Sequence, residues 1–161
     1  MESPPSRAKI LVVDDEPAIC QLEANTLTEL GHQVIEAGNG TDALQLAREE
    51  QPDLVLLDIL MPGLSGIEVC RQLRQDPHTR DVRIIVVSGV DAKQALEECI
   101  VAGADDFLAK PIDALELMVR VRSMLRVRNI QDEEQRVEAY VKNLQTMRRS
   151  RKAQRQEIAR G

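Results

Sequence analysis

The stretch KILVVDDEP, residues 9–17, decides the fold of this chain of 161 residues. Four apolar residues in a row are typical of a buried strand, and three acids follow them at once: Asp14, Asp15 and Glu16. Carboxylates at the edge of an apolar core cost free energy unless an opposite charge lies near them. The stretch therefore predicts a buried strand that ends beside a cation or a cationic side chain.

Four further apolar runs repeat this strand pattern. Together with the first, the predicted strands are residues 9–14, 33–37, 53–58, 83–89 and 106–109. Helix-length segments separate them, and we expect Pro17, Thr41 and Ser65 to lie at helix starts and Gly31 at a helix end. Apolar strands that alternate with helices are typical of a parallel sheet covered on both faces. The sequence therefore predicts an α/β fold with a doubly wound five-stranded parallel sheet.

The C-terminal part continues as a helix in this prediction. After Asp113 the pattern stays helical toward Ile158, with no Gly or Pro before Gly161. We therefore expect a flexible N-terminus at 1–8, a globular domain at 9–124 and an extended C-terminal helix at 125–161. Along this extension, apolar residues recur with the seven-residue repeat of a coiled coil.

The heptad register of the extension has nine a and d positions, and six of them are apolar or aromatic. The a positions are Ile130, Val137, Leu144, Arg151 and Ile158, and the d positions are Glu133, Tyr140, Met147 and Gln154. An isolated helix of this length gains little stability in water, so its apolar stripe should have a partner. We expect a homodimer through this helix. The alternatives are a solvated helix or a linker to an output domain that lies outside this chain.

Composition excludes several functional classes. Residues 1–123 carry 11 basic and 22 acidic side chains, whereas residues 124–161 carry 10 basic and 5 acidic ones. The basic C-terminal end could neutralise nucleic-acid phosphates, but no helix-turn-helix pattern is evident and the only aromatic residues are Phe107 and Tyr140. These features argue against a nucleic-acid partner and favour a solvated helix face.

The location of the protein follows from two absences in the sequence. No apolar run approaches the ~18 residues of a membrane span, and the first residues have no apolar signal core. The three cysteines stand alone in apolar segments, which is typical of buried thiols in a reducing compartment: Cys20, Cys70 and Cys99. We expect a cytoplasmic protein with no membrane partner.

Polar side chains follow four of the five predicted strands. Asp14 and Asp15 end the first, Asp58 ends the third, Ser88 ends the fourth and Lys110 follows the fifth. In a doubly wound sheet, ligands bind at the carboxyl ends of the strands, where the strand order reverses. Carboxylates with hydroxyl and amine partners suit Mg²⁺ and phosphate oxygens, and an aspartate can act as a nucleophile toward phosphorus.

The position of each residue suggests its role. Asp58 ends the most apolar run, DLVLLD, so we predict that it is the phosphoacceptor. We expect Asp15 to hold the metal and Asp14 to support it. Lys110 would pair with the phosphoryl oxygens, and Ser88 would donate a hydrogen bond to one of them. A metal ion and a lysine would thus neutralise the opening acids.

In these motifs the sequence resembles the receiver domain of bacterial two-component response regulators, over about residues 8–124. The motifs are ILVVDD, LVLLDILMPGLSG, IIVVSG and DFLAKP. The resemblance implies a flavodoxin-like sheet of order 2-1-3-4-5, similar to that of chemotaxis regulators. It also implies that Asp58 accepts phosphate from a histidine kinase or phosphotransfer protein, or from small phosphodonors. Asp15, Asp58 and the main-chain carbonyl of Leu60 would coordinate Mg²⁺, and the protein would be a signalling switch and not an enzyme.

The resemblance also implies how the switch works. Ser88 would move toward the phosphoryl group, and Phe107 would turn inward behind it. The surface of the fourth helix, fifth strand and fifth helix would then change, together with the C-terminal helix. Leu60 and Val90 match positions that orient the hydrolytic water in this family, and both are apolar. We therefore predict slow self-dephosphorylation.

Three alternatives differ from this hypothesis in chemistry. A haloacid-dehalogenase-like phosphatase needs a second Asp two residues after the nucleophile, where this chain has Leu60 after Asp58 and Glu16 after Asp14. A P-loop enzyme is excluded because GxxxxGK[ST] is absent. The third alternative is a receiver-like docking or dimerisation module that takes no phosphate. Receiver domains with such a helical extension resemble the front ends of longer regulators with an enzymatic output, such as cyclic-dinucleotide turnover.

Overall fold

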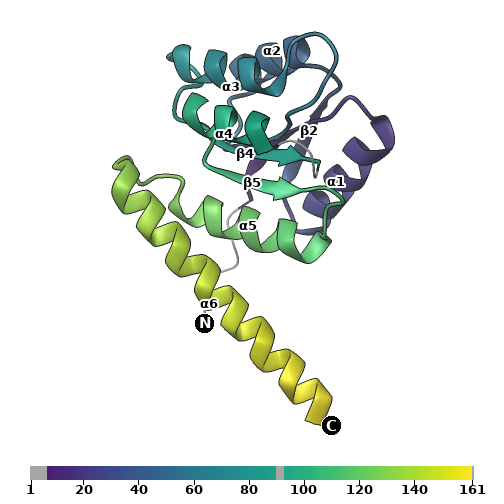
Figure 1. The fold of residues 1–161 in the computed structure, drawn as a ribbon, viewed down its shortest axis with the longest axis vertical. Coiled ribbons are helices and arrows are strands. Elements are labelled where there is room, and N and C mark those ends of the chain that lie inside the picture. The colour runs from purple at the N-terminus through teal and green to yellow at the C-terminus, as the bar shows by residue number, and fades with distance from the viewer. Residues whose placement is uncertain (1–6, 90–92, 161) are drawn as a thin grey trace.

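The structure is a computed structural model, and it describes residues 7–89 and 93–160, apart from the side chains of residues 150, 151 and 154. Strands and helices alternate through the first four-fifths of the chain, and one long helix follows (Figure 1). The elements are β1 (Lys9–Val13), α1 (Pro17–Glu29), β2 (Gln33–Ala37), α2 (Gly40–Glu50), β3 (Leu54–Asp58), α3 (Gly66–Gln75), β4 (Arg83–Ser88), α4 (Lys93–Ala102), β5 (Asp106–Ala109), α5 (Ala114–Val127) and α6 (Glu133–Arg160). The predicted alternation is confirmed.

The five strands form one parallel sheet in the order β2-β1-β3-β4-β5, which confirms the predicted topology. Val13 of β1 pairs with Ala37 of β2 on one side and with Leu57 of β3 on the other. The chain first moves outward from β1 to β2 and then crosses back to β3. The carboxyl ends of β1 and β3 therefore lie at the point where the strand order reverses, the usual place of a ligand site.

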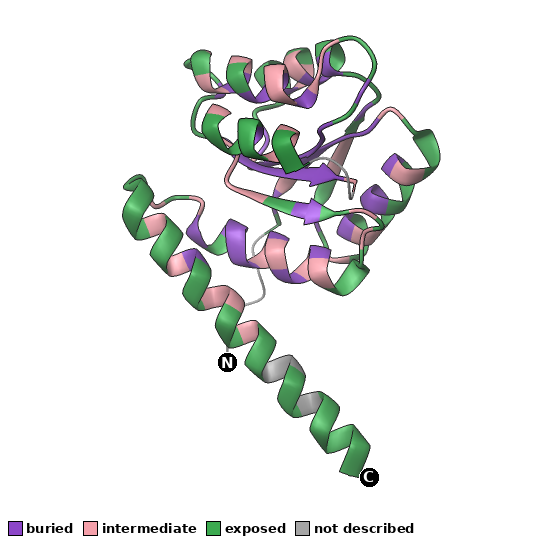
Figure 2. Cartoon of the chain, in the orientation of Figure 1, coloured by how far each residue is buried: buried purple, intermediate pink, exposed green. Residues whose placement is uncertain are grey.

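Successive strand residues face opposite sides of the sheet, and both sides are covered. Ile10 and Val12 of β1 pack with side chains of α1 and α5, whereas Leu11 and Val13 pack with those of α2 and α3. Every residue of β3 and β4 is buried, and the purple ribbon of β4 in Figure 2 illustrates this. The cysteines are free and buried, as predicted: Cys20, Cys70 and Cys99. Two aliphatic cores thus fix the sheet rigidly between its helices.

Several predicted helix boundaries are confirmed. Pro17 lies in the first turn of α1, and Gly31 follows that helix with a positive φ of 95°. Ser65 caps α3, since its side chain accepts a hydrogen bond from the main-chain N–H of Glu68 at 3.3 Å. The sequence therefore predicts the ends of these helices correctly.

The predicted cap of α2 at Thr41 is wrong. The side chain of Asn39 accepts the hydrogen bond from the N–H of Asp42 at 2.8 Å, and Thr41 lies inside the helix. Gly40 provides the physical reason for the early start. A Cβ at Gly40 would lie 2.8 Å from the carbonyl oxygen of Leu64, so only glycine lets the first turn of α2 approach the β3–α3 loop this closely.

The predicted uninterrupted C-terminal helix is also wrong. Helix α5 ends at Val127, and α6 begins at Glu133 after a short turn and returns along α5 (Figure 1). Asp132 caps α6, because its carboxylate accepts a hydrogen bond from the N–H of Gln135 at 2.9 Å. The extension is thus a second helix packed on the domain, and its C-terminal end projects beyond it.

The folded domain begins earlier than the predicted boundary at residue 9. Ala8 is buried, and its N–H donates to Nδ1 of His32 at 3.2 Å, whereas residues 1–6 lie outside the described residues. Within the described part of the chain, none of the helices combines the length and apolar character that crossing a membrane requires.

Candidate functional site

Three carboxylates meet at the carboxyl ends of β1 and β3. One oxygen atom from each of Asp14, Asp15 and Asp58 lies within 4.8 Å of the other two. Asp14 and Asp58 are almost fully buried, and Asp15 is more exposed than either. The structure thus brings together the three acids that the sequence predicted, and it places two of them inside the domain.

Local packing holds Asp58 in place. The N–H of Ile59 donates to the carbonyl of Val87 at 3.0 Å, which continues the β3–β4 pairing past Asp58. Helix α3 begins against the same loop, where a Cβ on Gly66 would lie 2.6 Å from the carbonyl oxygen of Asp58 and 2.7 Å from Cα of Ile59. The glycine therefore permits the close approach that fixes the loop around the carboxylate.

Lys110 supplies the cationic side chain that the buried acids require. Its Nζ lies 3.0 Å from Oδ2 of Asp58 and 3.5 Å from Oδ2 of Asp14. The main chain sets this position, since the N–H of Lys110 donates to the carbonyl of Ser88 at 2.7 Å. Ser88 itself is buried at the end of β4. The predicted amine and hydroxyl thus lie at the same end of the sheet as the acids.

Burial and charge shift the pKa values of these groups. Burial raises the pKa of Asp58 above its usual range, with a further rise from Asp14, while the hydrogen bond from Lys110 opposes the shift. Burial works against the charge of Lys110, but Asp58 and Asp14 together raise its pKa. Each group therefore depends on the other for its charge, and a buried carboxylate with few solvent contacts is more nucleophilic than one in water.

Glu23 of α1 is a buried acid beside this site that the sequence analysis missed. It is 2% exposed, and burial together with the charge of Asp14 raises its pKa to about 8. Its Oε1 has no hydrogen-bond partner among the described residues. The signal was available in the helical spacing of Cys20, Glu23 and Leu27, which places the carboxyl group on the inner side of α1.

A divalent cation fits this arrangement. The acids Asp14, Asp15 and Asp58 outnumber the single amine of Lys110, and Oδ2 of Asp14 is buried with no hydrogen-bond partner among residues 7–89 and 93–160. Oxygen ligands of this kind are what Mg²⁺ prefers, and it commonly takes only one or two protein carboxylates. The main chain of Leu60 lies at the same place, since its N–H donates to Oδ1 of Asp58 at 3.3 Å.

Phe107, the predicted switch aromatic, lies on β5 between the candidate site and α6. Its side chain is 39% exposed, and the guanidinium of Arg120 stands 6.0 Å from the ring centroid. The ring thus faces outward. Val90, predicted with Leu60 to lie where the hydrolytic water is oriented, is outside the described residues.

Comparison with known proteins matches this geometry to a family. The family model described as Response regulator receiver domain matches residues 10–122. The chain belongs to the response regulator receiver family. The match covers all five strands and helices α1–α5 nearly completely, and α6 lies outside it.

Relatives of this receiver domain differ in how much of their length it spans. The chain is 41% identical to the response regulator PleD of Caulobacter vibrioides over 132 residues, which are 82% of this chain but only 29% of PleD. It is also 41% identical to PilH of Pseudomonas aeruginosa over 118 residues, 73% of this chain and 98% of PilH. A crystal structure of the signal receiver domain of a Bermanella marisrubri response regulator matches with a TM-score of 0.65 and 40% identity, covering 70% of this chain and 93% of that one.

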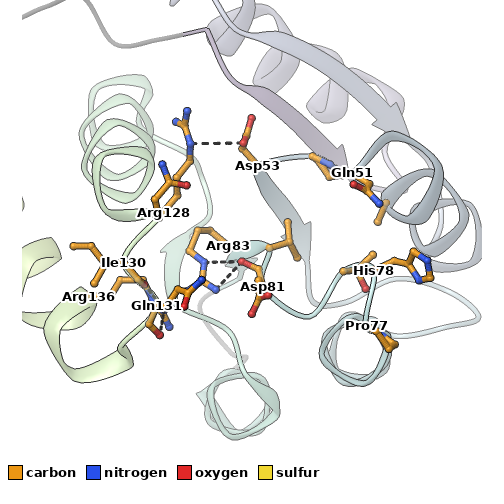
Figure 3. A pocket seen from close by; sticks show the side chains of 15 residues that line it. Gln51, Asp53, Pro77, His78, Asp81, Arg83, Arg128, Ile130, Gln131 and Arg136 are labelled. Carbon is orange, nitrogen blue, oxygen red and sulfur yellow. Dashed lines mark hydrogen bonds and ion pairs between the residues drawn. The ribbon is translucent and has the colours of Figure 1, made fainter.

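A separate hollow of about 330 Å³ lies at the opposite, amino ends of β3 and β4. Arginine side chains from three elements line it (Figure 3). Arg83 donates to the carbonyl of Asp81 at 2.7 Å and to Asp105 at 3.1 Å, and Arg136 donates to the carbonyl of Ile130 at 3.0 Å. Arg128 pairs with Asp53 at 3.6 Å. The Arg128–Asp53 pair attaches the α5–α6 turn to the base of the sheet.

Proposed function

We propose that the chain is a phosphorylation-controlled signalling switch in which Asp58 accepts the phosphoryl group. The observation that supports this most directly is the buried Asp58 carboxylate, 3.0 Å from Nζ of Lys110 and clustered with Asp14 and Asp15. The family to which the chain belongs consists of receiver domains, which receive phosphate from histidine kinases or phosphotransfer proteins. We propose the same class of partner here.

The chemistry is a phosphoryl transfer. A carboxylate oxygen of Asp58 attacks the phosphorus of a phosphohistidine, and the P–N bond breaks as the new P–O bond forms. The imidazole keeps the electron pair of the broken bond and takes up a proton from solvent. Lys110 then pairs with an oxygen of the transferred group, which replaces part of its contact with the carboxylate.

Residues of the acidic cluster would hold Mg²⁺ during this reaction. Asp15, Asp58 and the main-chain carbonyl of Leu60 would coordinate it, with Asp14 in support. The cation, when bound, would neutralise the charge of the phosphoryl oxygens and of the carboxylates around them. In its absence, the charge of Lys110 opposes the repulsion between Asp14 and Asp58.

The response to phosphorylation would pass from Ser88 to Phe107. Ser88 would donate a hydrogen bond to the phosphoryl group, and the outward-facing ring of Phe107 would turn into the space behind it. This ring is a Phe and has no hydroxyl group, so the change would act through packing. The surface of α4, β5 and α5 would then differ between the two states.

The lifetime of the phosphorylated state should be long. Leu60 follows the phosphoacceptor by two residues and is 64% exposed, so its side chain borders the path of an attacking water. An apolar side chain there cannot hold a water in line with the P–O bond.

The chain spans 29% of PleD, and we propose that it is the input part of a longer regulator, with α6 leading to an output domain.

Intact mass spectrometry tests the proposal. The parent and an Asp58→Asn variant are incubated with Mg²⁺ and a small-molecule phosphodonor, and Asp76→Asn, at a half-buried acid on the α3–β4 loop, serves as the matched control. We expect the parent and Asp76→Asn to gain one phosphoryl group and Asp58→Asn to gain none. A folded parent that gains no phosphoryl group would instead favour the docking or dimerisation module.

A further inference from the structure

Helix α6 is packed against its own receiver domain along its first half. Tyr140 is 7% exposed and belongs to the same apolar core as Leu117 and Val121 of α5. Leu144 packs against this core one turn later, and the hydroxyl of Ser123 donates to the sulfur of Met147 at 3.4 Å. The first four turns of α6 therefore cover one side of α5 (Figures 1 and 2).

Three residues of the heptad stripe dock α6 on the receiver domain: Tyr140, Leu144 and Met147. Ile130, the first a position, lies in the α5–α6 turn and packs against the same core. A helix cannot present one stripe to its own domain and to a second helix at the same time. The predicted coiled coil is therefore incompatible with the docked position of α6.

The distal half of α6 has no such cover. Every described side chain from residue 149 to residue 160 is exposed, and Ile158, in the same heptad register, is 80% exposed. Val137, another a position, is 53% exposed even within the docked half. The receiver domain is thus too short to bury the whole stripe. A second α6 has the same length and the same stripe, so it fits the stripe along its full course.

Polar contacts at the start of β5 hold α6 in place. The hydroxyl of Tyr140 donates to Oδ2 of Asp106, and Arg120 pairs with the same oxygen at 2.5 Å. Arg136 of α6 pairs with Asp105 at 3.8 Å. Farther along, Arg148 pairs with Glu116 of α5 at 3.1 Å. Asp105 and Asp106 therefore form the receiver-domain side of the contact with α6.

Strand β5 links these contacts to the candidate phosphorylation site. It begins at Asp106, includes Phe107 and ends at Ala109, directly before Lys110. Lys110 thus lies four residues from Asp106, whose carboxylate holds Tyr140, on a strand that is paired with β4 along its length. One short rigid element thus contacts both the acidic cluster and α6.

We propose that α6 exchanges between this docked position and a coiled coil with α6 of a second copy of the chain, and that the Asp106–Tyr140 contact sets the balance. The exchange stands on the packing of α6 alone. Its control by phosphate rests on the proposed function, because the phosphoryl group at Asp58 would shift β5 and weaken the contact.

Tyr140→Phe tests the exchange without any phosphorylation. The variant loses only the hydroxyl group, and Asp106 keeps its pairing with Arg120, so the receiver domain stays folded. Loss of one hydrogen bond to a charged acceptor should raise the undocked fraction roughly 10-fold to 100-fold. Both copies must undock to pair, so the apparent dimer Kd should fall by about the square of that factor, at least 100-fold.

Sedimentation equilibrium over a range of protein concentrations measures this Kd. Val137→Asp is the matched control, because the side chain is exposed in the docked helix but lies in the seam of the coiled coil. We expect Tyr140→Phe to dimerise at lower concentrations than the parent, and Tyr140→Phe/Val137→Asp to return to a monomer. A second release variant, Tyr140→Phe/Arg148→Gln, removes two of the attachments.

The outcomes separate the two proposals. If both release variants stay monomeric wherever the parent is monomeric, or if a dimer persists with Val137→Asp, the exchange is overturned. If the release variants dimerise while the parent takes no phosphate, the exchange stands and the proposed function fails. If the phosphorylated parent also dimerises and Val137→Asp abolishes that dimer, phosphate controls the exchange.

Discussion

Glu23 gives the sharpest prediction about stability, because it is a carboxyl group buried near Asp14 and Asp58. Its pKa of about 8 in the folded protein lies well above the value of 4.5 expected for an unfolded chain. Between these two pH values the folded protein keeps a proton that the unfolded chain loses. The free energy of unfolding should therefore fall as the pH rises, by up to about 1.4 kcal/mol per pH unit from this group.

Glu23→Gln removes this dependence while it keeps the shape of the protonated side chain. At pH 5.5 the variant should already be more stable than the parent by about 1.4 kcal/mol, since about nine-tenths of the unfolded parent chains have then lost the proton that the folded protein keeps. At pH 7.5 this difference should be larger by about a further 2–3 kcal/mol, in proportion to the two pH units between the measurements. Urea unfolding in a chelating buffer, followed by far-UV circular dichroism, measures both values.

The matched control is Glu29→Gln, which neutralises an exposed acid on the same helix. It should change the free energy of unfolding by less than about 0.5 kcal/mol at either pH. A stability difference between Glu23→Gln and the parent that is the same at pH 5.5 and pH 7.5 would refute the reasoning, because it would mean that Glu23 has the same pKa folded and unfolded.

Three further predictions concern the acidic cluster. Gly66→Ala should slow phosphorylation more than tenfold and lower the free energy of urea unfolding by about 1–3 kcal/mol, because the new Cβ would press on Asp58 and Ile59. Equal phosphorylation rates for variant and parent would contradict the close approach. Lys110→Met should lower the free energy of unfolding by about 2–4 kcal/mol in chelating buffer and by less with Mg²⁺, since it leaves Asp14 and Asp58 buried without the lysine charge. The control Lys9→Met removes a lysine from an exposed ion pair and should lower it by under about 1 kcal/mol. Leu60→Asn should speed the loss of phosphate at least about threefold, because the amide would hold a water for attack; intact mass measured over time follows this loss. Leu22→Asn on α1 is the exposed control. An unchanged rate in Leu60→Asn would exclude that role for Leu60.

The strands and the candidate site could be predicted because their signals are local and repeat. Each strand of the sheet is a short apolar run, and polar residues such as Asp58 and Lys110 follow the runs directly. In a parallel sheet the carboxyl ends of all strands lie at one edge, so the order of motifs along the chain is enough to bring these side chains together. Distances and the cis bond before Pro111 had to come from the structure.

The α5–α6 hairpin could not be predicted in the same way. The chain turns at residues 128–132 without Gly or Pro, and the only local signal is Asp132 followed by Gln135, which resembles a capping box. A heptad stripe shows that a helix has a partner, but it does not say whether that partner is another chain or the helix before it. The burial of Glu23 was missed for a related reason, since tertiary packing and not helix propensity puts an acid inside.

Location of the phosphoryl group on the chain tests the central claim most directly. After incubation with Mg²⁺ and a phosphodonor, hydride reduction converts an acyl phosphate of aspartate into homoserine, and peptide mass spectrometry identifies the altered residue. Homoserine at position 58, with unchanged aspartates at 14 and 15, is the predicted result. Homoserine at position 14 or 15 instead, or at none of the three in a folded and Mg²⁺-loaded protein, would contradict the assignment of Asp58 as the phosphoacceptor.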